Sequence, residues 1–410
     1  MTSVLFRNVE VWDASRSEPE ELEVLVESGV VKDVSDSPIR SESAQVVDGR
    51  GGFLMPGLID CHVHVTLSEV DLRKLAFIPV TMMTALAARN MRETLMRGFT
   101  TVRDCAGADK GLAMAVEAGL FQGPRIFQTG RALTQTGGHG DFRTPFENHD
   151  NSVDSNAIAP QSVIADGISE VRRAARNELR KGADFVKVMV SGGVASPTDP
   201  IDNAQYSIDE LSAIVDEAAA WNTYVAAHAY TSRAAANAVE SGIRTIEHGN
   251  LIDRETADLM AKNDAFLVPT LAAYDIMDKF GEELGLPKVS MEKLQVVKDA
   301  GIRAVEHCRA AGAKVGFGTD LLGDLRTHQS CSLALQAQAQ TSREVLVSAT
   351  RVNAEILNQS GKLGEIIPGA IADLILIDGD PLKDLGVLEH QGRNISVIMK
   401  DGKFEKCELG

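Results

Sequence analysis

The middle of the chain alternates short apolar runs with amphipathic helical stretches, and this alternation constrains the fold most. It extends from Pro56 to about Asn358, with helical stretches at Val80 to Arg97, Ile208 to Trp221 and Met291 to Ala311. The eight apolar runs are LIDCHVHV, TTVRD, RIFQTG, FVKVMV, TYVAAHA, RTIEHG, FLVPTL and KVGFGTD. Because eight strands that are each followed by a helix close into a ring, we predict an α/β fold with a (β/α)8 TIM barrel.

The two ends of the chain differ from this middle, since both contain short strand-like runs bounded by turn residues. At the N-terminal end Ser28-Gly29 is predicted to form a hairpin turn. We therefore predict a small β-sandwich domain built from residues 1–55 and 359–410, beside a catalytic barrel of residues 56–358. The long connection from Arg131 to Ala165 is polar and lacks helical or strand periodicity, so we predict an active-site loop there.

Charge and cysteine content narrow the class of protein. A formal net charge of −17 disfavours nucleic acid and membrane partners, and no segment reaches the roughly 18 apolar residues of a membrane span. The N-terminus has no signal-peptide pattern, so we expect a cytoplasmic protein. The cysteines are scattered and odd in number, which favours small buried or half-buried residues over disulfides: Cys61, Cys105, Cys308, Cys331 and Cys407.

Polar residues at the ends of the apolar runs are the strongest signals of chemistry, because a buried barrel strand should be almost entirely apolar. His62 and His64 are two residues apart, so on a strand both imidazoles point to the same face. Such a pair can chelate zinc or a similar divalent ion.

Lys187 lies between Val186 and Val188, where an uncompensated ammonium would be costly to bury. One explanation is a carbamate, formed with CO2, whose oxygens bridge two metals; the other is a lysine that extends its ammonium to water. His228, His248 and Asp320 end three further strands. Together with the histidine pair they predict one convergent site at the C-terminal face of the barrel.

Several motifs in order resemble the amidohydrolase superfamily. They are PGLIDCHVHV, GFTTVRD, QTGGHGDFR, KVMVSGGVASPTDP, AHAYT, GIRTIEHGNLID, VPTLAAYD, GFGTDLL and PGAIADLILIDGDPL. Within the superfamily the chain is similar to the imidazolonepropionase-like branch with its prolidases and Xaa-Arg or Xaa-Lys carboxypeptidases. The combination of QTGGHGD, MVSGGVASPTDP and AHAYT most resembles the prolidase-like group.

This resemblance implies a site with two divalent metal ions, with zinc expected, and a role for each ligand. His62 and His64 would bind the more buried ion, His228 and His248 the more exposed one, and carbamylated Lys187 would bridge them. Asp320 would complete the buried site and act as the proton shuttle in hydrolysis of an amide by metal-activated water.

Two more residues are predicted to bear on the substrate. Tyr230 lies two residues beyond His228 and shares its face if the strand continues, so it either hydrogen-bonds to substrate or packs. His139, in the Gly-rich part of the long loop, either donates to an oxyanion or substrate carboxylate or lies on the surface. We expect a supporting or structural role for Arg103, Asp104, Gly192 and Gly193. His328 is a candidate for the wall of the pocket. Surface positions are expected for His149, His307 and His390.

We therefore expect a binuclear-metal amidohydrolase that cleaves the C-terminal peptide or N-acyl amide bond of a small substrate. The expected substrates are dipeptides of the Xaa-Pro or general carboxypeptidase kind, or N-acyl amino acids such as ochratoxin, and we expect a homo-oligomer. One alternative is a cyclic amide or ester hydrolase. Another is a non-catalytic structural relative, but such proteins have lost ligands and this sequence has all six.

Overall fold

All eight barrel strands predicted from the sequence are present, in the predicted order. The computed structural model describes residues 3–146, 161–196 and 198–409. The barrel strands are β5 (Leu58–Val63), β6 (Phe99–Asp104), β7 (Arg125–Gln128), β10 (Val186–Met189), β11 (Val225–Thr231), β12 (Thr245–Leu251), β13 (Phe266–Val268) and β14 (Lys314–Val315). Neighbours pair in parallel in two series, β5 to β7 and β10 to β14.

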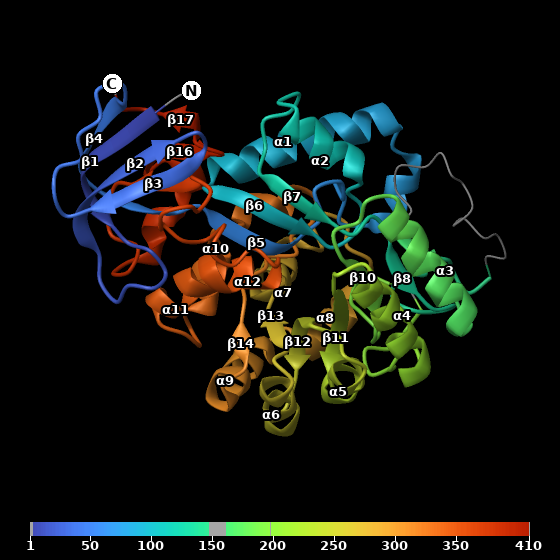
Figure 1. Ribbon diagram of the computed structural model, residues 1–410. Helices are drawn as coiled ribbons and strands as arrows, with labels where there is room; N and C mark the ends of the chain where they lie inside the picture. Colours follow the sequence, from blue (N-terminus) through green and yellow to red (C-terminus); the bar gives the residue numbers. More distant parts are fainter. Residues whose placement is uncertain (1–2, 147–160, 197, 410) are drawn as a thin grey trace.

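Backbone hydrogen bonds join these two series into a closed ring. Between β7 and β10, the Asp184 amide donates to the Gln128 carbonyl at 2.8 Å. Between β5 and the segment after β14, the Cys61 amide donates to the Phe317 carbonyl at 2.9 Å, and the Asp320 amide to the His62 carbonyl at 2.8 Å. The strands therefore form a TIM-like barrel, which Figure 1 shows beside the sheet of the chain ends.

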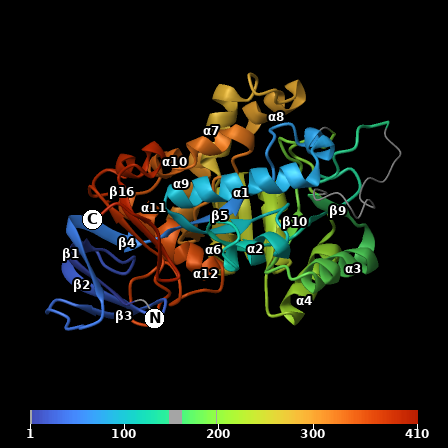
Figure 2. The same cartoon turned by 90° about the horizontal axis from the view of Figure 1, so that it is seen from above.

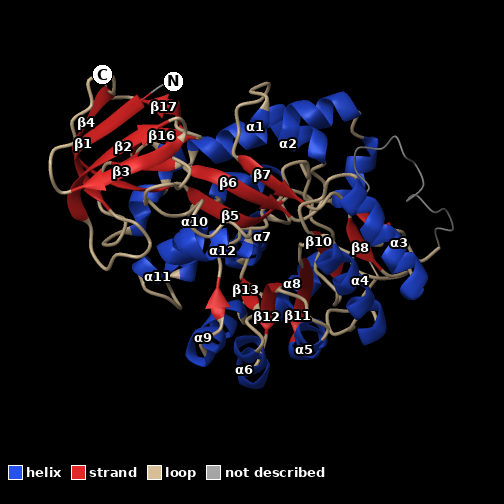
Figure 3. Ribbon diagram, in the orientation of Figure 1, coloured by secondary structure: helices blue, strands red, loops and turns tan. Residues whose placement is uncertain are grey.

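Helices surround the barrel, most of them on its outer side (Figure 3). They are α1 (Val80–Met96), α2 (Lys110–Glu117), α3 (Gly167–Arg180), α4 (Ile208–Ala220), α5 (Ser232–Glu240), α6 (Arg254–Lys262), α7 (Leu271–Phe280), α8 (Lys288–Val297), α9 (Gly301–Ala311), α10 (Cys331–Gln336), α11 (Ser342–Val347) and α12 (Asn353–Ile356). Helix α4 shows why such segments are helical. A capping box of Ser207 and Glu210 starts it, and the buried Leu211, Ile214 and Ala218 recur at the spacing of one helix face.

The chain ends form a separate seven-stranded sheet in the order β17-β16-β15-β4-β1-β2-β3. Its strands are β1 (Ser3–Val11), β2 (Glu20–Glu27), β3 (Val30–Ser35), β4 (Gln45–Pro56), β15 (Leu374–Ile377), β16 (Ile395–Lys400) and β17 (Lys403–Cys407). A bridge between Val30 and Ile371 folds the sheet back on itself, as a sandwich of both termini requires. Figure 2 shows this unit beside the barrel. The exact domain limits at 55/56 and 358/359 stay a prediction.

Local details of the sequence prediction are confirmed in part. Ser28 and Gly29 form the predicted turn, with φ of 54° and 87°. The single helix predicted from Met291 to Ala311 is wrong, because α8 ends at Val297 and α9 begins at Gly301. The Asn250 side chain donates to the Val297 carbonyl at 3.0 Å, which occupies an acceptor that a continuous helix would use.

Two other expectations also need correction. The connection from Arg131 to Ala165 contains two short strands, β8 (Ala132–Thr134) and β9 (Ser162–Ile164), although residues 147–160 within it lie outside the described residues. The five cysteines are free, but Cys407 is exposed rather than buried because it ends the edge strand β17. Among the described residues, no helix has the length and apolar character needed to cross a membrane.

Candidate active site

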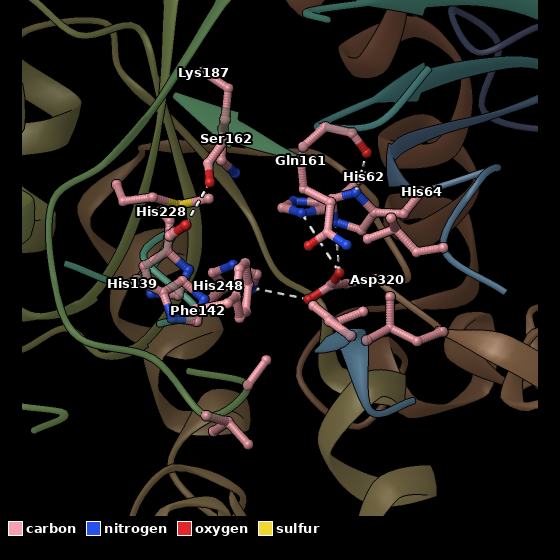
Figure 4. A pocket seen from close by; sticks show the side chains of 18 of the residues that line it. His62, His64, His139, Phe142, Gln161, Ser162, Lys187, His228, His248 and Asp320 are labelled. Atoms are coloured by element: carbon pink, nitrogen blue, oxygen red, sulfur yellow. Dashed lines mark hydrogen bonds and ion pairs between the residues drawn. The ribbon is translucent and has the colours of Figure 1, made fainter. Parts of the chain in front are cut away.

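A pocket opens at the ends of the barrel strands, and all the metal ligands and substrate-contacting residues predicted from the sequence line it. Its empty volume is about 700 Å³, including space open to solvent. The predicted residues in its wall are His62, His64, His139, Lys187, His228, Tyr230, His248 and Asp320. Figure 4 shows His62, His64 and Asp320 facing a second group that contains His139, His228 and His248. The barrel therefore brings residues from distant parts of the sequence to one mouth.

Buried charges orient His62. Its Nδ1 lies 2.7 Å from Glu247 Oε2, and the Arg103 Nη2 donates to Glu247 Oε1 at 2.7 Å. Arg103 and Glu247 are both fully buried. Because Glu247 accepts the Nδ1 hydrogen, the lone pair of His62 Nε2 is free to point into the pocket. Burial, ahead of the charge of Lys187, lowers the pKa of His62, which favours the neutral imidazole that metals bind.

Asp320 lies close to both His62 of strand β5 and His64, which follows the strand. Its Oδ1 is 3.1 Å from His64 Nε2 and 3.7 Å from His62 Nε2. Burial opposes protonation of His64, but the hydrogen bond and charge of Asp320 outweigh it and raise the pKa of His64. Ligand atoms of His62, His248 and Asp320 all lie within 4.8 Å of one another, close enough for one ion to contact all three.

The wall opposite His62 and His64 contains His228 and His248, and neutral groups hold these two histidines in place. His228 Nε2 donates to the Gly192 carbonyl at 3.1 Å, and His248 Nδ1 lies 2.7 Å from the Thr270 hydroxyl. The rings of His228 and His248 are 4.6 Å apart between centroids. Burial is the main cause that lowers the pKa of both histidines, so both are neutral. This wall therefore offers imidazoles in the state that binds metal.

Lys187 provides a test of whether the donor set fits two metal ions. Its side chain is 1% exposed, and its Nζ has no hydrogen-bond partner among the residues that the structure describes. A buried ammonium without a partner is costly, whereas a carbamate on the same nitrogen would be an anionic ligand between imidazoles. With four histidines and Asp320 around it, the donor set fits divalent metal ions.

The backbone is left-handed at two of the predicted ligands. His248 has φ of 70° and Asp320 has φ of 52°, conformations that L-residues rarely adopt. At His248 the left-handed backbone changes the direction in which the side chain points. In a regular strand, Glu247 and His248 would point to opposite faces, yet Glu247 hydrogen-bonds to His62 and the His248 ring lies 4.9 Å from the His62 ring. The strained turn therefore lets neighbouring residues serve one site.

His139 occupies the wall next to His228, with ring centroids 4.2 Å apart. Its Nδ1 lies 2.8 Å from the Ser196 hydroxyl, and burial lowers its pKa to about 4. Gly193 leaves the space for this ring, because a Cβ there would lie 2.1 Å from His139 Cε1. At Gly192 a Cβ would lie 1.8 Å from the Pro200 carbonyl oxygen. Both glycines thus have the structural role expected of them.

Lys293 of α8 anchors the segment that contains Ser196 through hydrogen bonds and an ion pair. Its Nζ donates to the carbonyls of Gly193 and Ser196 at 3.0 and 2.8 Å, and it forms an ion pair with Asp199 at 3.4 Å. These contacts fix the wall against which His139 packs.

Other polar residues singled out in the sequence lie away from the pocket or beneath it. Asp104 accepts hydrogen bonds from the backbone amides of Val65, Ala106 and Ala108, so it shapes the loops beside the mouth. His328 does not line the pocket and instead stacks on Phe280 at 5.1 Å.

The histidines expected on the surface differ among themselves. His390 is exposed, whereas His307 is half-buried and contacts the Ile252 carbonyl at 3.0 Å, which corrects that expectation. His149 lies outside the described residues.

Sequence reasoning missed Glu247, Tyr274 and Lys293. Glu247 had a signal, since a carboxylate inside the apolar run RTIEHG must find a buried partner. Tyr274 and Lys293 had none, because each is an ordinary residue of a helical stretch and its partners are distant in sequence.

Comparison with known proteins agrees with this geometry. The model of the amidohydrolase family matches residues 53–404. Ochratoxinase from Aspergillus niger is 34% identical over 366 residues, which cover 86% of this chain and 75% of that protein. A solved amidohydrolase is 48% identical with a TM-score of 0.98, and both chains are covered completely. A solved prolidase, complexed with N-methylphosphonate-L-proline, is 46% identical with a TM-score of 0.97, covering 99% of this chain and 100% of its own.

The family match spans most of the chain, including every residue of the described pocket. The barrel, the strand-end histidines and these similarities lead to one conclusion. The chain belongs to the amidohydrolase family and is a hydrolase that acts on amide or peptide bonds.

Proposed function

We propose that this protein is a binuclear-metal amidohydrolase that releases an amino acid from a dipeptide of the Xaa-Pro kind or from an N-acyl amino acid. The observation that carries the proposal is the buried Lys187 Nζ, which has no partner among the described residues and lies in a pocket lined by four predicted histidine ligands and Asp320. The proline derivative bound by the similar prolidase supports this substrate class.

The chain's own groups account for the proposed ligand set. His62, His64 and Asp320 would hold one ion and His228 and His248 the other. The Lys187 amine would add to CO2 and lose a proton, which would give a carbamate able to supply anionic oxygen ligands to the ions. Two divalent ions, with zinc expected, would supply a hydroxide nucleophile at neutral pH and polarise the scissile carbonyl.

Asp320 is the group that can move the proton. Because it contacts both His62 and His64 at the centre of the pocket, it can accept the proton of the attacking water and deliver it to the leaving nitrogen. This delivery matters because an amide nitrogen does not leave as an anion. Tyr230 and His139 lie on the opposite wall, where they can contact the substrate carboxylate.

The remaining wall of the pocket favours an uncharged acyl group or side chain. Lys187 and Asp320 are its charged residues among those that the structure describes. The apolar lining residues are Leu67, Leu72, Ala106, Phe142, Met189, Val194, Ala195, Met277 and Leu322. Among the described residues, a guanidinium or ammonium would find no free carboxylate in this wall, which supports Xaa-Pro or N-acyl substrates over Xaa-Arg or Xaa-Lys.

The test is a screen of zinc-loaded protein against dipeptides and N-acyl amino acids, read as release of the free amino acid. Apolar acyl groups with a free α-carboxylate should give the highest kcat/KM, and each substrate is paired with its carboxamide. Absence of release from every carboxylate substrate, or equal rates on the two members of each pair, would contradict the proposal. Hydrolysis confined to cyclic amides or esters would favour the alternative function.

A further inference from the structure

Buried hydroxyl groups connect His248 to Tyr230 behind the wall of the pocket. His248 Nδ1 lies 2.7 Å from Thr270 Oγ1, Thr270 donates to the Tyr274 hydroxyl at 3.3 Å, and Tyr274 donates to the Tyr230 hydroxyl at 3.1 Å. None of the four side chains is more than 4% exposed. The groups therefore satisfy one another rather than bulk water. We call these three contacts the hydroxyl chain.

Counting hydrogens gives the hydroxyl chain a direction. Each hydroxyl carries one hydrogen, and Thr270 donates its hydrogen to the Tyr274 hydroxyl. Toward His248, Thr270 can then only accept, so His248 Nδ1 carries a hydrogen and Nε2 keeps the lone pair that a metal ligand needs. The hydroxyl chain thus selects one tautomer of His248.

The same count leaves Tyr230 as a donor. Its oxygen accepts from Tyr274. The hydrogen of Tyr230 is not used in this contact, and Tyr230 lines the pocket. A carboxylate can only accept hydrogen bonds, so a hydroxyl fixed as a donor matches it. Incoming bonds also polarise a hydroxyl and strengthen its donation.

We propose that Thr270 and Tyr274 are positioning residues that fix the Tyr230 hydroxyl as the donor to the substrate α-carboxylate and hold His248 in its metal-binding tautomer. The proposal rests on the proposed function for the identity of the acceptor. A purely structural role, in which a buried tyrosine hydroxyl needs any partner, would make no difference between substrates.

The first test is a double-mutant cycle of Tyr230→Phe and Tyr274→Phe in the full-length zinc-loaded protein. Phe removes the hydroxyl and keeps the ring. On a carboxylate substrate, Tyr274→Phe should lower kcat/KM by about 3- to 10-fold. On the paired carboxamide, and in the Tyr230→Phe background, the same change should have almost no further effect. Binding of the product amino acid, measured by calorimetry, should weaken by a similar factor. Independent losses, or equal losses on both substrates, overturn the proposal.

Tyr206→Phe is the matched control. Its buried hydroxyl donates to the Ala165 carbonyl at 3.0 Å and does not line the pocket. Its loss should lower thermal stability without changing the ratio of rates on the carboxylate and carboxamide substrates. A change in that ratio as large as that of Tyr274→Phe would overturn the proposal, because it would mark a general effect of lost tyrosine hydroxyls.

A second test does not depend on the substrate. Thr270→Val removes the acceptor of the His248 hydrogen, so the variant should bind less zinc at a fixed free zinc concentration, and Thr270→Ser should restore binding. Equal zinc content in all three proteins would overturn the link to His248. If the wild type releases no amino acid from any carboxylate substrate, the proposed function fails, and the zinc measurement still decides whether the hydroxyl chain acts on His248.

Discussion

Different interactions support the two walls of the pocket, one containing His62 and the other containing His228 and His248. Behind His62 lies the fully buried ion pair of Arg103 and Glu247, with a separation of 2.7 Å. Behind His228 and His248 lie a carbonyl and a hydroxyl, and no acidic side chain contacts them as closely among the described residues. Figure 4 shows these walls facing each other across the space that a substrate would enter.

The difference matters because the two kinds of support differ in strength. Removing one partner of a buried ion pair costs about 3–5 kcal/mol, whereas a neutral hydrogen bond contributes about 1 kcal/mol. We infer that the charged wall fixes the ligand geometry and that the neutral wall orients the substrate. Variants on each wall should separate these roles.

Lys187→Ala should have the largest effect, since this residue would serve both walls. Loss of metal and activity should exceed the roughly 10- to 100-fold change typical of residues that only support a ligand. Short carboxylic acids should restore part of both, because they can replace the missing bridge. The measurement is zinc per chain by elemental analysis, with kcat on the best substrate. A variant with two ions per chain and normal turnover would refute the role of Lys187.

Glu247→Gln tests the charged wall. It leaves Arg103 buried without its counter-charge, so the free energy of unfolding should fall by about 3–5 kcal/mol. Metal affinity should fall by roughly 10- to 100-fold, because the neutral amide oxygen of Gln is a weaker acceptor for the His62 hydrogen than the carboxylate. Chemical denaturation and zinc titration measure the two effects. Substrate preference should stay unchanged, and a shifted preference would show that this wall also contacts the substrate.

Tyr230→Phe tests the neutral wall. Loss of a hydrogen bond to a charged carboxylate should cost about 1.5–3 kcal/mol, or roughly 10- to 150-fold in kcat/KM. The paired carboxamide substrate should lose much less, and zinc content should stay close to that of the wild type. Equal losses on the two substrates would place the carboxylate elsewhere.

Gly193→Ala should have the smallest effect. The new Cβ would overlap the His139 ring, so the ring must shift, and kcat/KM should fall by about tenfold. Zinc content should remain unchanged because His139 is not among the expected ligands. If zinc is lost as well, His139 and the metal-binding histidines move as one unit and the separation between walls fails.

Much of this molecule could be predicted from sequence because its signals are local. Apolar runs mark the eight strands, and their polar ends meet because parallel barrel strands share one mouth. Thus His62, Lys187 and Asp320 could be assigned to one pocket although they are more than a hundred residues apart.

The remaining features depend on contacts between distant segments. Strand alternation separates Glu247 from His248, and only the left-handed turn at His248 brings both to His62. Likewise the helix break after Val297 depends on Asn250, which lies 47 residues earlier. Neither position carries a local pattern that indicates its partner.

The left-handed backbone at His248 and Asp320 has a consequence for how this protein tolerates heat. Such a conformation costs an L-residue about 1–2 kcal/mol, whereas glycine adopts it freely. Replacing either residue by glycine removes this cost, although glycine also gains entropy in the unfolded chain. In the presence of a chelator, selection for heat tolerance would therefore favour glycine at these two positions. Selection in the presence of metal would retain His248 and Asp320, because the bound metal stabilises the folded protein through them.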